Sequence, residues 1–250
     1  MAKFGLIIVG DEILSGRRVD QHLPRVIAML GERGLLLSWV KIIGDDKAVL
    51  DDTLKQSFAS DDIVFSTGGI GATPDDMTRE AAARALGVAV ERHPEGVKIL
   101  EKFASDRGRT LAEHQYKLVE FPAGAQLIHN PINTIPGFSV RDHHFVPGFP
   151  EMAWAMIEWV LDHRYPHHQD QRYKETAILI KGQYESAMAP LMEAIETKHP
   201  QVKTFCLPTM KEDVPVNEIG LKGDAAKVDL AFADLMAMVD AKAYQWEPVE

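Results

Sequence analysis

The fold is decided by the segment Asp62-Ile63-Val64-Phe65-Ser66-Thr67-Gly68-Gly69-Ile70-Gly71-Ala72-Thr73-Pro74-Asp75-Asp76-Met77-Thr78, in which an apolar run leads into a glycine-rich turn. A helix is predicted over residues 74–86, with Thr73 as its N-cap, Pro74 at its first position and Gly87 just past its end. Glycines let a backbone approach a ligand closely, and a helix start offers unpaired N–H groups, so this order of elements suits a phosphate or another anion. Helix capping alone would account for Asp76 but would leave the three glycines unexplained.

Strands and helices are expected to alternate on both sides of this segment. Short apolar runs at 4–9, 35–43 and 62–66 are typical of strands that are buried on both faces. Helical spacing of apolar residues predicts helices at 23–30, 48–58, 95–104 and 151–161. The alternation predicts an α/β fold with a doubly wound, mostly parallel sheet.

The composition changes near residue 162. A polar, histidine-rich stretch at 163–171 is interpreted as a linker between a first domain at 1–165 and a small domain at 172–242. The small domain is predicted to be α+β with the order βαββα, from a strand at 175–181, a helix at 186–198, strands at 202–207 and 216–221, and a helix at 225–239. Residues 244–250 are predicted to form a loose tail.

The composition is that of an ordinary globular protein, with 46% hydrophobic and 26% charged residues. Lysine and arginine number 27 against 37 aspartates and glutamates, which gives a formal net charge of −10. So acidic a chain is a poor candidate for binding nucleic acid or an anionic membrane surface through its overall charge. The single cysteine, Cys206, permits no internal disulfide, and no signal peptide or spanning apolar stretch is recognised, so the cytoplasm is the expected compartment.

Three acidic pairs follow the first three expected strands, at Asp11-Glu12, Asp45-Asp46 and Asp75-Asp76. Because parallel strands end on the same side of a sheet, the pairs should share the edge where open α/β sheets bind ligands. Two like charges 4 Å apart repel by about 4 kcal/mol at an effective dielectric of about 20, so a bound divalent cation would explain their convergence. The alternative is that each pair lies in a solvated loop and starts a helix, and it stays open, above all for Glu12 and Asp46.

Four stretches in the first 165 residues or so carry a resemblance to a known family. They are 9–16 (Val-Gly-Asp-Glu-Ile-Leu-Ser-Gly), 67–78, Asn130 with 134–138 (Thr-Ile-Pro-Gly-Phe), and 146–152 (Val-Pro-Gly-Phe-Pro-Glu-Met). In this order they resemble molybdopterin-binding (MoaB/Mog-like) domains, specifically the amino-terminal domain of the competence/damage-inducible protein A (CinA) family. The small domain resembles the KH-like domain that follows in that family. No counterpart of the family's amidohydrolase domain is recognised, so its deamidase activity is not expected.

The resemblance implies a pocket for a pterin or a nucleotide phosphate at the rim of the sheet. It places Asp45 and Asp76 at the positions of catalytic, metal-associated aspartates and implies a divalent metal ion, Mg²⁺, Mn²⁺ or Co²⁺. The implied reaction is hydrolysis of a nucleotide pyrophosphate such as ADP-ribose. The alternatives are adenylyl transfer to molybdopterin, which would then be the ligand, and binding of a pterin or nucleotide without catalysis. A homo-oligomer is also expected.

The candidate site residues fall into two groups. The expected metal ligands are carboxylates of the three acidic pairs, namely Asp11, Glu12, Asp45, Asp75 and Asp76. The expected phosphate- or ligand-binding residues lie in the glycine-rich segment and in a later proline-glycine turn, and are Thr67, Gly68, Gly69, Gly71, Thr73, Thr78, Pro136 and Gly137.

Three positions depart from the family's usual pattern, with Ala72 in place of a proline, His22 in place of an asparagine and Asn133 in place of a glycine. None of these departures removes an expected metal ligand. His143 and His144 are adjacent on an expected strand, so they should face opposite sides as structural residues rather than bind zinc together.

Overall fold

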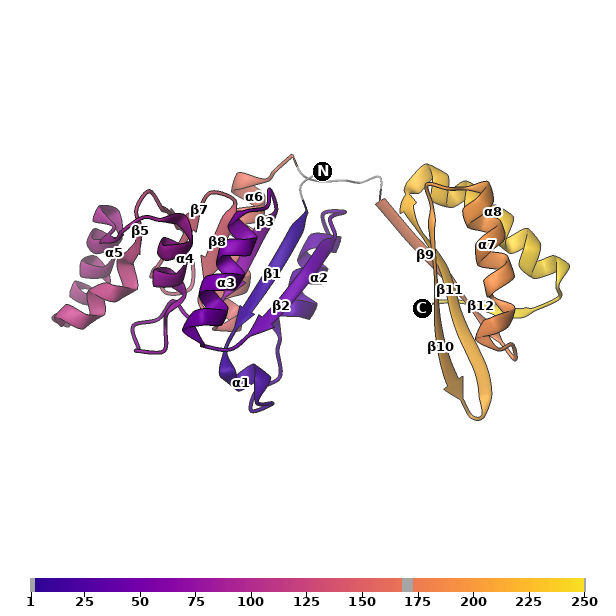
Figure 1. The fold of residues 1–250 in the computed structure, drawn as a ribbon, viewed down its shortest axis with the longest axis horizontal. Helices are drawn as coiled ribbons and strands as arrows, with labels where there is room; N and C mark the ends of the chain where they lie inside the picture. The colour runs from indigo at the N-terminus through magenta and orange to yellow at the C-terminus, as the bar shows by residue number, and fades with distance from the viewer. Residues whose placement is uncertain (1–2, 168–172, 250) are drawn as a thin grey trace. The chain divides into compact units, whose positions relative to one another are not determined.

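A computed structural model describes residues 3–167 and 173–249 of the chain (Figure 1). The described residues divide into two compact units, one of residues 3–32 and 36–167 and one of residues 173–249 with 33–35. The expected linker at 163–171 lies partly outside the described residues, and its first two residues belong to helix α6 (Pro150–Arg164). None of the helices in the described part of the chain is long and apolar enough to span a membrane.

The first unit is built on a six-stranded sheet with the strand order β2-β1-β3-β8-β7-β6. Four neighbouring strands are parallel, β2 (Leu37–Ile43), β1 (Phe4–Val9), β3 (Ile63–Thr67) and β8 (His143–Val146). Two short strands, β7 (Gly137–Val140) and β6 (Gln126–Ile128), extend the sheet in antiparallel pairing. The predicted α/β fold with a mostly parallel sheet is therefore confirmed. A separate pair joins β4 (Val90–Arg92) to β5 (Glu120–Pro122).

Helices cover both faces of this sheet because the buried strands present apolar side chains on each side. On one face α3 (Lys47–Phe58) and α4 (Thr78–Leu86) lie side by side (Figure 1). Leu50 and Leu54 of α3 belong to the same core cluster as Ile7 of β1. The helices α2 (His22–Gly31) and α6 contact one another and bury residues such as Met29 and Met156. Burial of each such side chain contributes about 1.5–3 kcal/mol to the stability of the folded unit.

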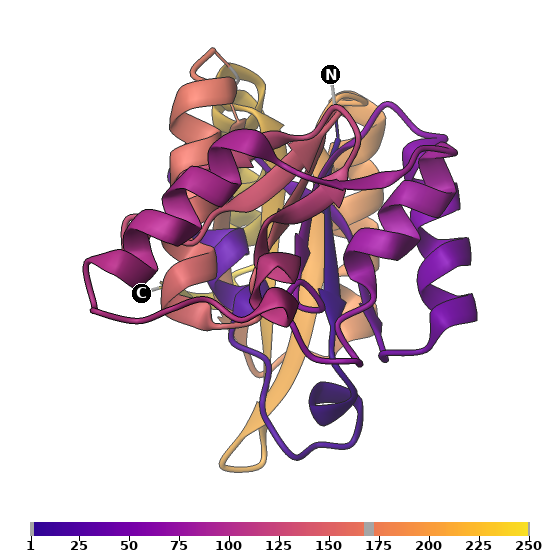
Figure 2. The ribbon, with the colours of Figure 1, turned by 90° about the vertical axis from the view of Figure 1, so that its left-hand side faces the viewer.

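Shorter helices complete the first unit. A four-residue helix, α1 (Asp11–Leu14), follows β1 directly. Helix α5 (Pro94–Ser105) and the 3₁₀ helix η1 (Glu113–Val119) lie between β4 and β5 in the chain. In Figure 2 the first unit is seen from the side on which α5 lies.

The two histidines of β8 are buried on opposite faces of the sheet, as predicted. Nε2 of His143 lies 2.8 Å from the hydroxyl of Ser57, and its ring stacks on Phe58 of α3 at 4.0 Å between ring centres. Nε2 of His144 lies 2.7 Å from the hydroxyl of Tyr165. Burial lowers the pKa of His143 to about 4 and that of His144 to about 3, so both rings are neutral structural parts of the core.

The predicted start of the helix after the glycines is wrong. Helix α4 begins at Thr78 with Met77 at the N-cap position, so residues 74–77 are not helical and Thr73 caps no helix. The physical reason is local competition, because the Asp76 carboxylate accepts hydrogen bonds from the preceding loop and closes a turn there instead.

The second unit is an antiparallel sheet with two main helices. The strand order is β10-β11-β9-β12, with β10 (Lys203–Lys211), β11 (Val214–Asp224), β9 (Tyr173–Lys181) and β12 (Gln245–Pro248). Helices α7 (Ala189–Lys198) and α8 (Ala225–Ala241) bury Leu191 and Leu235 against this sheet, and a short 3₁₀ helix, η2 (Glu185–Ala187), precedes α7. The prediction of a loose tail is wrong for β12, because its residues pair with β9 along Gln245–Pro248.

Candidate functional site

The carboxyl ends of β1, β2 and β3 lie next to one another because these strands are parallel neighbours. The backbone N–H of Asp11, after β1, donates to Oδ2 of Asp45, after β2, over 3.0 Å. The backbone N–H of Asp45 donates in return to Oδ1 of Asp11 over 3.2 Å. Gly44 makes room for this pairing, since a Cβ there would lie 2.3 Å from Oδ1 of Asp11. The two loops are thereby fastened together with their carboxylates side by side.

The carboxylate of Asp45 has other acidic side chains of this edge as neighbours. Partial burial raises its pKa, and a hydrogen bond from the Asp11 backbone opposes that effect. The negative charges of Asp11, Glu12 and Asp75 raise the pKa of Asp45 further. The structure thus pairs Asp11 with Asp45, and Glu12 and Asp75 lie near enough for their charges to act on Asp45. We call Asp11, Glu12, Asp45 and Asp75 the rim carboxylates.

The rim carboxylates do not form a closed metal cage. Within residues 3–167 and 173–249 there is no group of three or more His, Cys, Asp or Glu side chains placed to hold a metal ion by themselves. Mg²⁺ is commonly held by one or two carboxylates together with substrate phosphate oxygens and water. A cation at this rim would therefore take part of its ligand set from the bound substrate.

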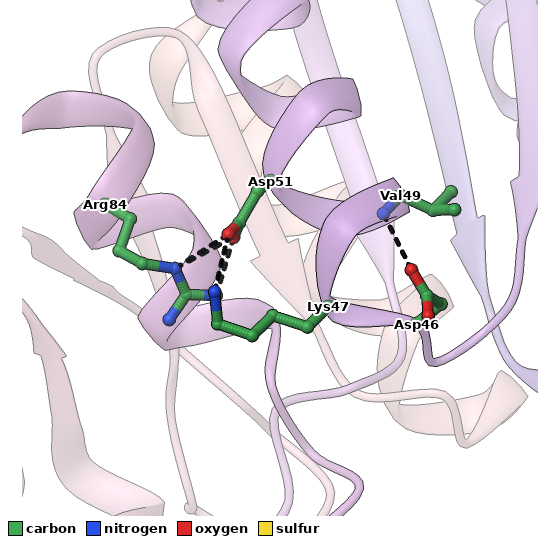
Figure 3. Close-up of polar contacts among 5 residues, drawn as sticks. All are labelled: Asp46, Lys47, Val49, Asp51 and Arg84. Carbon is green, nitrogen blue, oxygen red and sulfur yellow. Dashed lines mark hydrogen bonds and ion pairs between the residues drawn. The ribbon is translucent and has the colours of Figure 1, made fainter.

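Asp46 has a different role from its neighbour. Its side chain accepts a hydrogen bond from the backbone N–H of Val49 over 3.0 Å and forms the N-cap of α3 (Figure 3). An N-cap of this kind stabilises a helix by about 1 kcal/mol. The capping interpretation of Asp46 is therefore confirmed.

The glycine-rich loop after β3 has a backbone that only glycine adopts readily. Gly68 and Gly69 have φ angles of +95° and +68°. A Cβ at Gly68 would lie 2.2 Å from the carbonyl oxygen of Val9, and a Cβ at Gly69 would lie 2.1 Å from the hydroxyl of Thr78. Two of the three glycines of this loop are therefore required by the path of the chain.

Asp76 fixes the shape of this loop. Its Oδ1 accepts from the backbone N–H of Gly71 over 2.7 Å. Its Oδ2 accepts from the backbone N–H of Thr73 over 2.9 Å and from the Thr73 hydroxyl over 2.5 Å. Both carboxylate oxygens of Asp76 thus accept hydrogen bonds within the loop, and Asp76 stabilises, or braces, the conformation of the loop.

The side chain of Arg79 also holds the glycine-rich loop in place. It is only 1% exposed, although arginine is rarely buried, and its guanidinium donates hydrogen bonds to the carbonyl oxygens of Ile70 and Gly71. Burial lowers the pKa of Arg79, while the charges of Glu80 and Asp76 act in the opposite direction. Sequence reasoning missed Arg79, because an arginine one residue inside a helix is ordinarily exposed to solvent.

The braced loop is left with unused hydrogen-bond donors. The carbonyls of Ile70 and Gly71 are held by Arg79, and the amides of Gly71 and Thr73 by Asp76. By contrast, the backbone N–H groups of Gly69, Ile70 and Ala72 have no acceptor in the described part of the chain. Consecutive free amides of this kind form the concave binding site for anions that is called a nest.

This loop forms one wall of a cavity in the first unit that measures about 450 Å³ and that we call the larger cavity. The opposite walls come from the segments 130–136 and 147–152. Most of the lining side chains are apolar, with a few polar groups among them, as is usual for a site that takes a small organic ligand. The lining residues are Gly69, Ile70, Gly71, Ala72, Thr73, Asp76, Leu118, Asn130, Asn133, Ile135, Pro136, Pro147, Gly148, Phe149 and Met152.

Two asparagines shape the wall opposite the loop. Nδ2 of the buried Asn130 donates to Oδ1 of Asn133 over 2.8 Å and to the carbonyl of Ile135 over 2.9 Å. Oδ1 of Asn133 also accepts from the backbone N–H of Ile135 over 3.0 Å. The side chain of Asn133 is therefore part of the cavity wall.

A smaller cavity of about 350 Å³ lies at the ends of β1 and β3 and the start of α2. Its polar lining residues are Glu12, Arg18, Asp20, Gln21, His22 and Thr67. Gly148 lines both cavities, and a Cβ at this position would lie 3.5 Å from the Cα of Gly68. The two cavities therefore flank the first glycine of the loop.

The residues that the sequence predicts to bind a phosphate or ligand lie in different places. Thr67 lines the smaller cavity, and the larger one is lined by Gly69, Gly71, Thr73 and Pro136. Gly137 and Thr78 belong to the buried scaffold instead. A Cβ at Gly137 would lie 2.4 Å from the carbonyl of Phe145, and the backbone N–H of Thr78 donates to the carbonyl of Gly69.

Comparisons with known proteins agree with this architecture. Residues 5–167 match the family described as "Probable molybdopterin binding domain". A CinA-like protein of Anaeromyxobacter sp. (strain Fw109-5) is 34% identical over 161 residues, which are 62% of this chain and 39% of that protein. A protein of Pyrobaculum calidifontis is 28% identical over 254 residues, 95% of each chain.

A solved structure is similar as well. The CinA protein of Thermoplasma acidophilum, described as of unknown function, aligns with a TM-score of 0.58 at 27% identity and covers 64% of this chain and 97% of its own. The chain spans about two fifths of the CinA-like relative from Anaeromyxobacter. Its first unit carries the matched residues, and the chain accordingly belongs to the family of molybdopterin-binding domains, within the CinA-like group.

Proposed function

We propose that this rim binds a phosphate-bearing nucleotide and hydrolyses its phosphoanhydride with the help of a divalent metal ion. The substrate class is an ADP-ribose-like nucleotide. The proposal rests on one observation above all, the glycine-rich loop whose free amides line a cavity of about 450 Å³ and whose chain continues through Asp75, one of the rim carboxylates. Phosphoanhydride hydrolysis requires donors for a phosphate and ligands for a cation, and the loop amides and the rim carboxylates would supply them.

The rim carboxylates suit a hard divalent cation such as Mg²⁺, Mn²⁺ or Co²⁺. Partial burial and, after it, the like charges of its neighbours raise the pKa of Asp45, and a cation would relieve the repulsion between these charges. Asp45, with Asp11 paired to it and Glu12 close by, is the natural group to hold the ion. A bound ion would neutralise charge on the phosphate oxygens and lower the pKa of a coordinated water.

The chain's own residues bind and orient the substrate. The amides of the loop donate to a phosphate, and because Asp76 and Arg79 already brace that loop, little reorganisation is needed on binding. The apolar wall at Ile135, Phe149 and Met152 suits a flat ring. In the reaction, water adds to one phosphorus and the anhydride P–O bond breaks, so that two phosphate monoesters leave.

Release of AMP from ADP-ribose in the presence of Mg²⁺, Mn²⁺ or Co²⁺ tests this proposal. Asp45→Asn keeps an oxygen that can accept from Asp11 but removes the charge, so turnover should fall by at least about 100-fold. The matched control is Asp51→Asn on α3, whose carboxylate pairs with Arg84 and lies outside the rim. Unchanged turnover in Asp45→Asn would refute the assignment, and so would an equal loss in Asp51→Asn.

A second candidate is adenylyl transfer to molybdopterin, which the description of the matched family favours. It requires the same loop and the same metal ion, but an acceptor phosphate would take the place of water. Restoration of cofactor synthesis in a bacterial strain that lacks the adenylyltransferase would support it. A third candidate is binding without catalysis, which calorimetric binding of nucleotides or pterins without product formation would support.

A further inference from the structure

The smaller cavity contains two buried polar atoms whose hydrogen bonds are not satisfied. His22 is 6% exposed and Thr67 is 1% exposed, and both residues line this cavity. Neither Nδ1 of His22 nor Oγ1 of Thr67 has a hydrogen-bond partner among residues 3–167 and 173–249. Burying a polar atom without a partner is unfavourable, so two of them in one wall indicate a site that a polar ligand group completes.

The contacts of His22 determine what its free nitrogen can do. Nε2 lies 3.2 Å from the carbonyl oxygen of Gly148, and because a carbonyl only accepts, Nε2 carries the proton. Burial lowers the pKa of His22, which keeps the ring neutral. Nδ1 of the neutral ring is therefore a hydrogen-bond acceptor, and it needs a donor from the ligand.

The remaining polar groups of the cavity include acceptors and donors, and the donors are the guanidinium of Arg18 and the amide of Gln21. The Glu12 carboxylate lines the same wall, and the Thr67 hydroxyl both donates and accepts. The Asp20 carboxylate is already used, because it accepts from the backbone N–H groups of His22 and Leu23 at the start of α2. Such a cavity favours a compact ligand group with several hydroxyls, because each hydroxyl can donate to an acceptor such as Nδ1 of His22 and accept from a donor such as Arg18.

The position of the cavity connects it with the phosphate site. Thr67 directly precedes Gly68, and Gly148 lines both cavities. A phosphate bound to the amides of the loop would therefore lie next to the smaller cavity. A sugar joined to that phosphate by one ester bond could reach it.

We propose that the smaller cavity is a ribose subsite, in which His22 and Thr67 bind the 2′- and 3′-hydroxyl groups of a nucleotide whose phosphate lies on the glycine-rich loop. The inference rests on the proposed function and adds to it the requirement for a ribose with free hydroxyls. A pterin lacks such a sugar, so the subsite favours nucleotides over pterins as ligands.

Calorimetric titration with AMP, 2′-deoxy-AMP, 3′-deoxy-AMP and 2′,3′-dideoxy-AMP in Mg²⁺ tests the subsite without any mutation. Each hydroxyl removed should weaken binding to the unaltered chain by about 3- to 10-fold, the usual effect of one hydrogen bond. Thr67→Val and His22→Leu should each bind AMP more weakly and discriminate less between AMP and its deoxy analogues. Thr53→Val, an isosteric change at a buried threonine of α3, should keep the full discrimination.

Each outcome has a separate meaning. Equal affinity of the unaltered chain for AMP and dideoxy-AMP would overturn the ribose subsite and leave the proposed function standing. Undiminished discrimination in both Thr67→Val and His22→Leu would overturn it as well. If none of the four nucleotides binds, the proposed function itself is contradicted.

Discussion

Replacing Arg79 with methionine should destabilise the first unit and weaken nucleotide binding together. Methionine fills much of the same volume but donates no hydrogen bond, so the carbonyls of Ile70 and Gly71 would lose the donors that hold them. These carbonyls are the points at which α4 fixes the glycine-rich loop. The loop should become mobile, and its free amides would no longer be held in place for a phosphate.

The magnitude follows from the two hydrogen bonds and from burial. Hydrogen bonds from a charged donor contribute about 1.5–3 kcal/mol each, and the cost of burying the guanidinium, which lowers the pKa of Arg79, offsets part of the sum. We therefore expect a loss of about 3 kcal/mol. For a unit of this size that corresponds to a decrease in Tm of about 6–12 °C.

Arg84→Met provides the matched control, because it makes the same chemical change five residues further along the same helix. Arg84 is half-exposed and pairs with Asp51, with 2.6 Å between Nη2 and Oδ1 (Figure 3). A surface pair of this kind contributes about 0.2–1 kcal/mol, so Tm should change by at most about 4 °C and AMP affinity should not change.

Thermal unfolding followed by circular dichroism, and titration with AMP below the transition, measure both effects. The reasoning is refuted if Arg79→Met unfolds within about 2 °C of the unaltered chain. It also fails if the variant is destabilised as expected but binds AMP with full affinity, since the loop would then need no brace.

Three further predictions concern other parts of the fold. Gly68→Ala should lower the free energy of unfolding by at least about 2 kcal/mol, because Gly68 has a φ of +95° and an added Cβ would clash with the Val9 carbonyl. The control Gly31→Ala in α2 should leave this free energy unchanged or raise it, as measured by urea unfolding. Below pH 6.5 the unfolded chain protonates His143 but the folded chain does not until about pH 4, so the free energy of unfolding should decrease over this range by about 3 kcal/mol from this residue. His143→Gln should flatten that slope in denaturant titrations at a series of pH values. Truncation after Tyr244 removes β12, including the half-buried Trp246, and should destabilise the second unit by about 2 kcal/mol as measured by hydrogen exchange.

The parts of the fold that could be predicted depend on local pattern. Continuous apolar runs identified β1 and β3, and their parallel pairing followed from the alternation with helices. The same reasoning placed the acidic pairs at one edge, where Asp11 and Asp45 are now seen to exchange hydrogen bonds. The opposite-facing positions of the two β8 histidines also follow from sequence spacing, whereas the N-cap role of Asp46 was one of two alternatives that the sequence left open.

The parts that were missed depend on contacts between distant residues. The start of α4 could not be placed because Asp76 bonds backward to Gly71, which capping rules for helices do not include. Arg79 gave no signal, and His22 stood out only as a departure from the family's usual pattern, since burial of a polar side chain is set by the neighbours that fold around it. Strand β12 was missed because its few residues gain stability only by pairing with β9.

The central claim is that the rim carboxylates and a bound nucleotide hold one metal ion between them. The affinity for Mn²⁺, measured by electron paramagnetic resonance with and without AMP, tests this claim most directly. Because no metal cage exists within the described residues, AMP should increase Mn²⁺ affinity by at least about tenfold, and Asp45→Asn should abolish the increase. Mn²⁺ binding that is unaffected by AMP, or an increase that survives in Asp45→Asn, would contradict the account.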